Sequence, residues 1–482
     1  MSCEYQKEIK LVYTFLWQSM ASLLFYLLLF GFYFPSICFS QQTSVKYWIS
    51  TGDRTQLLKE QTTPLLFAGS KNNPDAIVVD DSKRFQTIDG FGFALTGGSA
   101  WHIIHMDAAD RKKLLQEIFG KKPDDISVSY LRVSIGASDL NDHVFTYDDM
   151  PEGQTDPEMK HFDLQEDKKD VIPVLKEILA INPHIKILGS PWSAPAWMKT
   201  GGQMKGGSLK FQYYGVYADY FVKYLQAMQR EGIRIDAITI QNEPLNEGNT
   251  PSMKMQATEQ LQFIKKNLGP LFRKKNIKTK IILYDHNCDE PGYPLTILND
   301  PGAAAYVDGS GFHLYGGKIE AMTEVHNAYP KKNLYFTEQM VVDDRGFRIA
   351  AQVNRLIIGA TRNWSRNVLL WNLAADKDNK PHTDNGGCSM CQGALTIEGN
   401  HFSRNLAYYV IAHASKFVRP GSVRIRSTQT GRVSDVAFRT PEGKTVLIVA
   451  NNSDDNQLFA VQISGKAFST NLDAGAVGTY VW

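Results

Sequence analysis

Two glutamates in this sequence stand just beyond apolar stretches that are typical of buried strands. Glu243 follows the run AITI (237–240) after a glutamine and an asparagine, and Pro244 prevents the strand from continuing. Glu338 follows the run NLYFT (333–337) in the same way. A carboxyl group at the mouth of an apolar strand is costly unless a reaction or a ligand uses it. Paired carboxyl groups can act as general acid, general base or nucleophile.

Aromatic and hydrogen-bonding side chains stand at the ends of neighbouring apolar runs. They are Trp192, Asn242, His313, Tyr315 and Trp371. Taken singly, a tryptophan is usually a core residue, and a glutamate at a strand end is usually solvated. Taken together, two acids, aromatic faces and polar donors are what cleavage of a glycosidic bond requires. The acids transfer a proton and attack, the aromatic faces bind the sugar, and the donors bind its hydroxyls.

Two further acids near these runs have ordinary explanations. Asp139 follows the run YLRVSIG (130–136), where it is either a third acid of the site or the N-cap of a helix. Glu247 lies four residues beyond Glu243 and is expected to be solvated in a loop.

The elements that would position these residues form a repeating pattern of strands and helices. Eight apolar runs predict strands at 91–95, 130–136, 186–193, 237–243, 280–287, 309–316, 333–340 and 367–373. Helical patterns fill the gaps, which favours a closed (β/α)₈ TIM barrel of parallel strands. The alternative is an open doubly wound sheet, but no glycine-rich phosphate loop follows the first strand. In a barrel, Glu243 on strand four and Glu338 on strand seven meet at one mouth.

Both ends of the folded part read as antiparallel β structure. Runs after about residue 410 alternate apolar and polar residues, and the runs VKYWIST and AIVVD near the start could complete the same sandwich. We therefore predict a signal peptide at 1–40, the N-terminal strands of a β-sandwich at 41–85, the catalytic barrel at 86–405 and the C-terminal β-sandwich at 406–482.

Charge and the leader limit the partners and the location. The net charge is +2 and no long basic run occurs, so a nucleic-acid partner is not expected. The apolar leader ends with Cys38 and Ser40 at the −3 and −1 positions of a cleavage site, which predicts a signal peptide. The mature chain would then be secreted, periplasmic or at the cell surface, without stable membrane insertion. The alternative is an uncleaved membrane anchor, because roughly 20 apolar residues can span a bilayer.

Three cysteines lie outside the leader: Cys288, Cys388 and Cys391. The pair in CSMC could be half a zinc site, a redox pair or a local disulfide. No second CxxC completes a zinc site, and export favours the disulfide. His382 and Asp384 stand nearby, but metal binding there is the weaker alternative.

Six motifs together resemble glycoside hydrolase family 30, which includes glucosylceramidases and endo-β-1,6-glucanases. They are GFGFALTGGSA, SPWSAPAWMKT, QNEP, FHLYGG, TEQ and LLWNLA, and the resemblance spans about residues 85–420. NEP alone is shared by many barrel glycosidases, whereas the combination is specific. The resemblance implies a barrel with a sandwich built from both chain ends.

For catalysis, the resemblance implies that Glu243 is the acid/base and Glu338 the nucleophile of a retaining enzyme. Glu243 would then rest protonated and Glu338 ionised, because two like charges so close push one pKa upward. No cofactor and no metal is implied.

For binding, the resemblance implies contacts to the reacting sugar. Asn242 would bind its 2-hydroxyl, Tyr315 would orient the nucleophile, and His313 would support Tyr315. Trp192 and Trp371 would line the subsite of the reacting sugar.

The sequence departs from the glucosylceramidase pattern at Gly97. An aspartate is expected there to bind a terminal glucose, and its loss would open space beyond the non-reducing end. The predicted substrate is therefore β-1,6-glucan or a related β-glucoside, with glucosylceramide as the alternative. A non-catalytic glucan-binding barrel is the alternative of another class, and the presence of both glutamates argues against it.

Overall fold

The computed structural model describes residues 44–482, apart from 70–72, 74 and 343–347. The leader predicted at 1–40 lies outside these residues. Within the described ranges, no helix is both long and apolar enough to cross a membrane.

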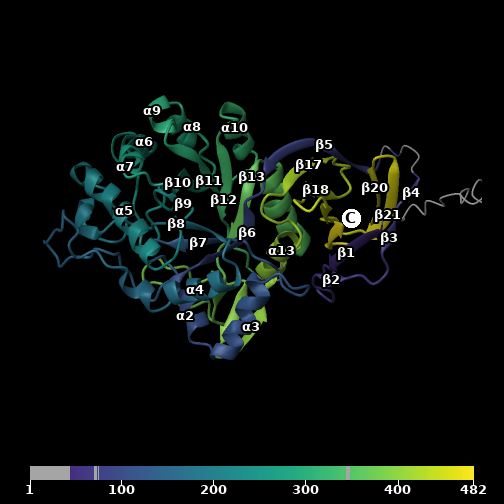
Figure 1. Cartoon of the computed structure of the whole chain (residues 1–482), viewed down its shortest axis with the longest axis horizontal. Helices are drawn as coiled ribbons and strands as arrows, with labels where there is room; N and C mark the ends of the chain where they lie inside the picture. Colours follow the sequence, from purple (N-terminus) through teal and green to yellow (C-terminus); the bar gives the residue numbers. More distant parts are fainter. Residues whose placement is uncertain (1–43, 70–72, 74, 343–347) are drawn as a thin grey trace, which may run out of the picture. The chain divides into compact units, whose positions relative to one another are not determined.

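Eight parallel strands close into a barrel, as the sequence predicts (Figure 1). In chain order they are β6 (Gly90–Leu95), β7 (Tyr130–Ser134), β8 (Lys186–Ser190), β9 (Ala237–Thr239), β10 (Lys280–Cys288), β11 (Val307–Gly317), β12 (Asn333–Glu338) and β13 (Ser365–Leu370). Pairing of β13 with β6 completes the ring. All eight predicted runs belong to it, and the open-sheet alternative is wrong.

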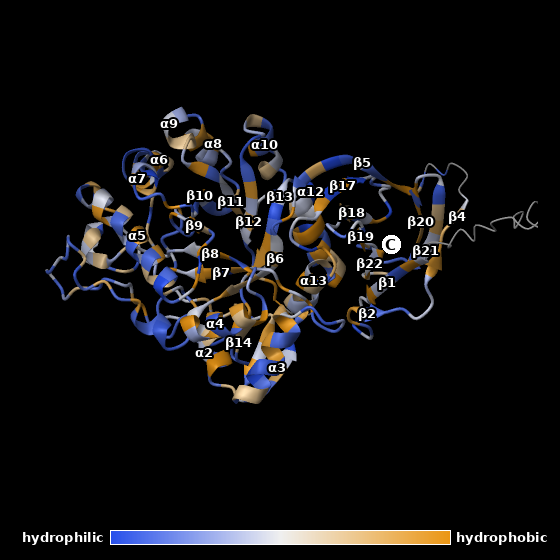
Figure 2. Ribbon diagram, viewed as in Figure 1, coloured by the Kyte–Doolittle hydropathy of each residue, from blue (hydrophilic) through white to orange (hydrophobic). Residues whose placement is uncertain are grey.

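Helices follow the strands and cover the outside of the barrel (Figure 1). They are α2 (Gly97–Ile104), α3 (Ala108–Phe119), α4 (Val171–Ile181), α5 (Tyr214–Arg230), α6 (Ala257–Phe263), α7 (Gly269–Lys274), α8 (Gly292–Leu298), α9 (Pro301–Ala304), α10 (Ala321–Ala328), α11 (Ile349–Gln352), α12 (Gly359–Arg362) and α13 (Leu406–Ser415). In α3 the apolar Leu114, Leu115, Ile118 and Phe119 are buried at helical spacing, and its other face is polar (Figure 2).

One layer of the barrel interior is apolar and fully packed. It consists of Tyr130, Leu188, Ala237, Ile282, Tyr335 and Leu369, which come from six different strands. Tyr130, Ala237, Ile282 and Tyr335 stand in the first half of their strands, and polar side chains gather beyond them toward the carboxyl ends.

The two chain ends together build the second β structure, as predicted. Its strands are β1 (Ser44–Ser50), β2 (Lys59–Glu60), β3 (Leu65–Leu66), β4 (Ala68–Gly69), β5 (Ile77–Thr87), β17 (Val423–Ser427), β18 (Ser434–Arg439), β19 (Thr445–Ala450), β20 (Gln457–Ile463), β21 (Lys466–Leu472) and β22 (Val477–Val481). β1 pairs with β22, and β5 pairs with both β17 and β20. The sequence reading missed β21, and α13 precedes β17 within the segment 406–482.

A small sheet follows the barrel strands and carries a loop over their carboxyl ends. It consists of β14 (Ala374–Ala375), β15 (Leu395–Glu398) and β16 (His401–Arg404). The loop between β14 and β15 contains both cysteines of CSMC.

Candidate active site

The two predicted glutamates meet at the carboxyl ends of β9 and β12. One oxygen of Glu243, one oxygen of Glu338 and one ring nitrogen of His313 all lie within 4.8 Å of one another. Retaining glycosidases hold their carboxyl groups about 5–5.5 Å apart, whereas inverting enzymes need about 6.5–9.5 Å to admit a water. The separation therefore fits direct attack on the sugar by one of the two carboxylates.

The glutamates line a cavity of about 280 Å³. Its other lining residues are Asp139, Asn246, Asn249, His286, Asn287, Tyr315, Met340, Trp371, Cys388 and Cys391. A larger cavity of about 590 Å³ is lined by Asp236 and Thr279, which immediately precede β9 and β10. That cavity lies at the amino ends of the strands, where barrels of this type do not place their chemistry.

Three of the predicted binding residues are buried and are not among the residues that line the cavity: Trp192, Asn242 and His313. Trp192 stacks on Trp371 with 5.1 Å between ring centroids, so of the two tryptophans only Trp371 reaches the cavity. Asn242 and His313 are buried; His313 contacts both glutamates, and Asn242 contacts Arg132. Trp192 therefore supports the lining indole and is not itself part of the lining.

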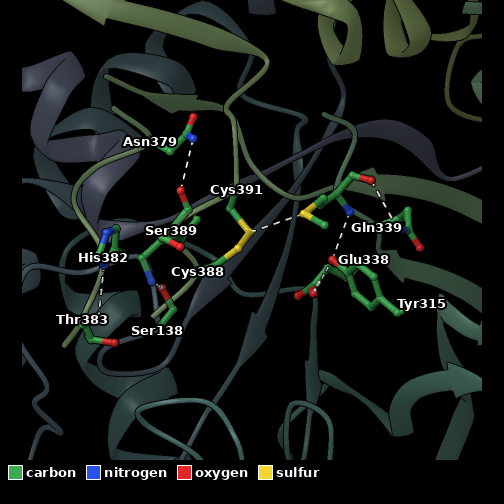
Figure 3. Close-up of a disulfide and its surroundings, with 12 residues drawn as sticks. Ser138, Tyr315, Glu338, Gln339, Asn379, His382, Thr383, Cys388, Ser389 and Cys391 are labelled. Atoms are coloured by element: carbon green, nitrogen blue, oxygen red, sulfur yellow. Dashed lines mark hydrogen bonds between the residues drawn. A yellow bond between two sulfur atoms is a disulfide. The ribbon is translucent and has the colours of Figure 1, made fainter. Parts of the chain in front are cut away.

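Glu338 receives two strong hydrogen-bond donors. Arg132 donates to it at 2.5 Å, and the hydroxyl of Tyr315 donates at 3.1 Å. The backbone N–H of Met340 donates in turn to the Tyr315 hydroxyl at 3.0 Å, which fixes the phenol (Figure 3). Burial raises the pKa of Glu338, although the positive charges of His313 and Arg132 act to lower it. The two donors favour its ionised form, the form that a nucleophile needs.

A buried ion pair beneath the glutamates holds the site together. Arg132 is fully buried and donates to Asp285 at 2.8 Å and to the side-chain oxygen of Asn242 at 2.7 Å. Asp285 also accepts from hydroxyl groups at 2.6–2.7 Å, those of Ser190, Thr239 and Thr337. Burial acts to raise the pKa of Asp285, but the charge of Arg132 holds it well below its usual range. Asp285 is therefore a permanent negative charge.

Sequence reasoning missed Asp285 and gave Arg132 no role. Asp285 stands within the apolar run KIILYDHN, and a charge in such a run is a signal of a buried partner. Its φ of 67° and the irregular register between Tyr284 and His286 turn its side chain into the barrel. Strict alternation along the strand would not predict that direction.

Glu243 is held by an imidazole and an amide on a strained backbone. His313 Nδ1 lies 3.1 Å from one of its oxygens, and Asn246 donates to the other at 2.7 Å. The φ of Glu243 is 45°, a left-handed conformation that a glutamate rarely adopts. Burial acts to raise the pKa of Glu243, but the hydrogen bond and charge of His313 outweigh burial and hold it at about 2.

We expected Glu243 to have the higher pKa of the two glutamates, but its pKa is the lower one. Burial acts to lower the pKa of His313, but the charge of Glu338 and hydrogen bonds to Asp285 and Glu243 raise it to about 9. His313 Nε2 lies 3.1 Å from the permanently ionised Asp285 and must donate to it. Without substrate, the proton that we expected on Glu243 therefore rests on His313, its hydrogen-bond partner.

Asp139 brings a third carboxyl group into the cavity. No helix begins at Asp139, so the N-cap explanation is wrong. One of its oxygens is buried without a hydrogen-bond partner in the described part of the chain. Burial, together with the charges of Glu338 and Glu243, raises its pKa well above the usual range. An unpaired, neutral carboxyl group at the cavity wall can bind a sugar hydroxyl.

Gly97 does not line this cavity but a neighbouring one. A Cβ placed there would lie 2.0 Å from Asn141 Nδ2. Position 97 therefore offers no carboxyl group to the reacting sugar in this chain, whereas Asp139 lines the catalytic cavity. That the missing aspartate opens space beyond the non-reducing end stays a prediction. Glu247 is solvated as expected and pairs with Lys254 at 3.2 Å.

A disulfide joins Cys388 to Cys391 on the rim of the cavity. Figure 3 shows it facing the segment that carries Glu338 and Gln339. Cys391 Sγ lies 3.7 Å from Met340 Sδ, and Cys391 also packs in one cluster with Trp371. His382 contacts a backbone oxygen, that of Thr383, at 3.3 Å. The cysteines therefore form the local disulfide and not half of a zinc site.

Glu243, His313 and Glu338 are also a possible donor set for a metal ion. Both nitrogens of His313 already face carboxylates, and Arg132 contacts Glu338 at 2.5 Å. A second cation would have to overcome the repulsion of this guanidinium. The arrangement fits an acid pair better than a metal site.

Comparisons with known proteins agree with this geometry. Residues 88–418 match the glycosyl hydrolase family 30 TIM-barrel domain, and residues 421–480 match the family's beta sandwich domain. An endo-1,6-beta-D-glucanase of Aspergillus fumigatus is 33% identical over 88% of this chain and 91% of its own length. The lysosomal acid glucosylceramidase of Mus musculus is 27% identical over 84% of this chain and 82% of its own.

A solved structure supports the same assignment. The endo-beta1,6-glucanase BT3312 is 35% identical, superposes with a TM-score of 0.84, and the match covers 91% of this chain and 99% of that one. The family match extends over both the barrel and the sandwich. This chain is therefore a glycoside hydrolase that belongs to glycosyl hydrolase family 30.

Proposed function

We propose that the chain hydrolyses β-1,6-linked glucan with retention of configuration. The separation of the two glutamates supports the retaining mechanism, because oxygens within 4.8 Å of each other are too close to admit the water that an inverting enzyme places between its base and the sugar. The names of the similar endo-glucanases support β-1,6-glucan as the substrate.

In the first step, Glu338 attacks the anomeric carbon and the glycosidic C–O bond breaks. Glu243 delivers a proton to the departing oxygen, and a covalent glycosyl-enzyme forms. In the second step, Glu243 takes a proton from a water molecule, whose oxygen attacks the same carbon. The bond to Glu338 breaks, and the product has the β configuration of the substrate.

His313 supplies the proton that Glu243 passes on. The charge of Glu338 is the largest influence that raises the pKa of His313. When Glu338 becomes an ester, that charge disappears and the imidazolium becomes more acidic. The proton can then cross the 3.1 Å hydrogen bond to Glu243 as the leaving oxygen takes one from Glu243. Asp285 keeps the ring oriented throughout.

The remaining residues divide into those that contact the sugar and those that support them. Trp371 and Asp139 line the cavity and would contact the ring and its hydroxyls. Asn242 is fixed by Arg132 at 2.7 Å and would bind the 2-hydroxyl. Tyr315 orients Glu338, and Trp192 supports Trp371 from behind.

We also propose that the enzyme is exported and its leader is removed. The apolar segment before Ser40 supports this, and so does the disulfide, because such bonds persist in oxidising compartments.

Product analysis tests the proposed function. The purified enzyme is incubated with β-1,6-glucan, with glucosylceramide and with a chromogenic aryl β-glucoside. We expect β-1,6-linked oligosaccharides from the polymer, with β-anomers formed first. Faster release of glucose from glucosylceramide would favour the alternative substrate. No turnover of any β-glucoside would favour a glucan-binding protein.

A further inference from the structure

A second cavity, of about 270 Å³, lies beside the catalytic one. Its lining includes one exposed tryptophan and several polar side chains: Trp101, Asn141, Asp142, Asp170, Asp376 and Lys380. Trp101 stands on α2 and is 48% exposed, which is unusual for so large an apolar side chain. Its ring packs against His105 at 4.5 Å between centroids, so the indole is held in place although one face is open.

One short segment separates the two cavities. Asp139 lines the catalytic cavity and Asn141 lines the second, with only Leu140 between them. Two residues span at most about 7 Å. The segment is fixed on both sides, because Leu140 accepts from the Gly98 N–H at 2.9 Å and Asp139 accepts from the Thr383 N–H at 3.0 Å. A polymer in one cavity can therefore reach the other.

Asn141 presents an unused donor to the second cavity. Its Oδ1 accepts from the Ser138 N–H at 2.9 Å, which orients the amide. Its Nδ2 then faces Gly97, and no acceptor for it lies among the described residues. Any side chain at position 97 would cover this nitrogen. A donor that is already oriented and still accessible can bind a ligand oxygen with little rearrangement.

We infer that the second cavity is a carbohydrate site that binds another part of the glucan chain whose bond is cleaved next door. This inference rests on the proposed function. The open indole offers an apolar face to a sugar ring, and Asn141 donates to a hydroxyl. Asp142, Asp170 and Asp376 offer acceptors, while Lys380 adds one positive charge. Three carboxyl groups disfavour an anionic ligand, and a neutral polyhydroxylated chain suits the mixture.

Substrates of different length separate this site from the catalytic one. An aryl β-glucoside fills only the catalytic cavity, whereas polymeric β-1,6-glucan can occupy both. We expect Trp101→Ala to raise the KM for the polymer roughly two- to tenfold and to leave both constants for the aryl glucoside unchanged. Phe211→Ala is the matched control, because Phe211 is 80% exposed and lines neither cavity.

A binding measurement removes the dependence on turnover. In a Glu338→Gln background, migration through gels that contain β-1,6-glucan should be retarded, and Trp101→Ala should weaken the retardation. Equal KM values and equal retardation with and without Trp101 would overturn the inference. Equal losses on the aryl glucoside and the polymer would also overturn it, since Trp101 would then support only the catalytic cavity. A wild-type enzyme that cleaves neither substrate would instead contradict the proposed function.

Discussion

Glu243 and His313 share one hydrogen bond of 3.1 Å, and the acid proton of the site lies in that bond. The pKa of Glu243 is held at about 2 and that of His313 is raised to about 9, so the proton rests on the imidazole. Such coupled groups titrate as a pair. Glu243 can therefore still act as the proposed acid despite its low pKa, because His313 can return a proton to it through their hydrogen bond.

The two glutamates should fail differently when replaced. Glu338→Ala removes the nucleophile, so activity should fall on every substrate. Glu243→Ala keeps the nucleophile, so an aryl glucoside with a good leaving group should still form the glycosyl-enzyme, which then accumulates. Added azide should rescue turnover of this variant and give a β-glycosyl azide. Stopped-flow kinetics and mass spectrometry measure both effects.

Azide also checks the assignment of roles. An α-glycosyl azide from Glu338→Ala would fit the proposed roles, whereas a β-glycosyl azide from Glu338→Ala and an α-glycosyl azide from Glu243→Ala would exchange them. A loss below about tenfold in both variants, or under about 1.4 kcal/mol of activation free energy, would contradict the proposed site.

The pH dependence of kcat/KM should reflect the proton on His313. Burial raises the pKa of Glu338, so the acid limb should lie above the ordinary glutamate value as Glu338 loses its proton. His313 is protonated below its pKa of about 9, so the rate should fall as pH rises through that value. In His313→Gln the proton must stay on Glu243, and the alkaline limb should move to lower pH. An unchanged alkaline limb in this variant would contradict the relay.

Asp139 should contribute to binding of the reacting sugar. Asp139→Ala removes its hydrogen bonds, so kcat/KM should fall about tenfold or more, and Asp139→Asn should lose less because it keeps a donor and an acceptor. Steady-state kinetics on the aryl glucoside measures the effect, with thermal unfolding as a check of the fold. Glu247→Ala is the control, since this solvated acid contacts Lys254 and not the cavity. Equal kinetics for wild type and Asp139→Ala would rule out this contact.

Opening the disulfide should displace Glu338, because Met340 links the disulfide to the contacts of this glutamate. Cys391 contacts Met340, whose backbone N–H holds the Tyr315 hydroxyl near Glu338. We expect the double variant Cys388→Ser, Cys391→Ser to lower kcat by up to about tenfold, because small displacements of catalytic groups are costly. Dithiothreitol should lower the activity of wild type similarly and leave the variant unaffected. A response of the variant to dithiothreitol would place the sensitive group elsewhere.

The predicted leader can be tested directly on the mature protein. Cleavage after Ser40 predicts an amino terminus at Gln41, which sequencing or intact-mass measurement would show. A mature chain that keeps the apolar segment and partitions into membranes would instead support the anchor.

The sequence predicted the barrel well because its periodic runs report burial directly. It also placed both glutamates, since a carboxyl group after an apolar strand is a local signal. It did not place Asp285, which depends on an irregular strand. It left Asp139 open between a third acid and an N-cap, because the position of Asp139 depends on a loop packed against distant segments. The pKa order of the glutamates also depends on His313, which reaches Glu243 only in the closed barrel.

Pairing of β1 with β22 has a consequence for synthesis of the chain on the ribosome. Lys46 lies opposite Val481, so β1 can pair early with β2 and β3 but gains β22 only after residue 481 has been made. The barrel ring has the same property, since β6 closes against β13. During translation the early strands therefore have unpaired edges, which favour aggregation until the rest of the chain has been made. A stop codon just before Val477 would remove β22 and leave both β1 and β19 without that neighbour, although every residue of the cavity would be present.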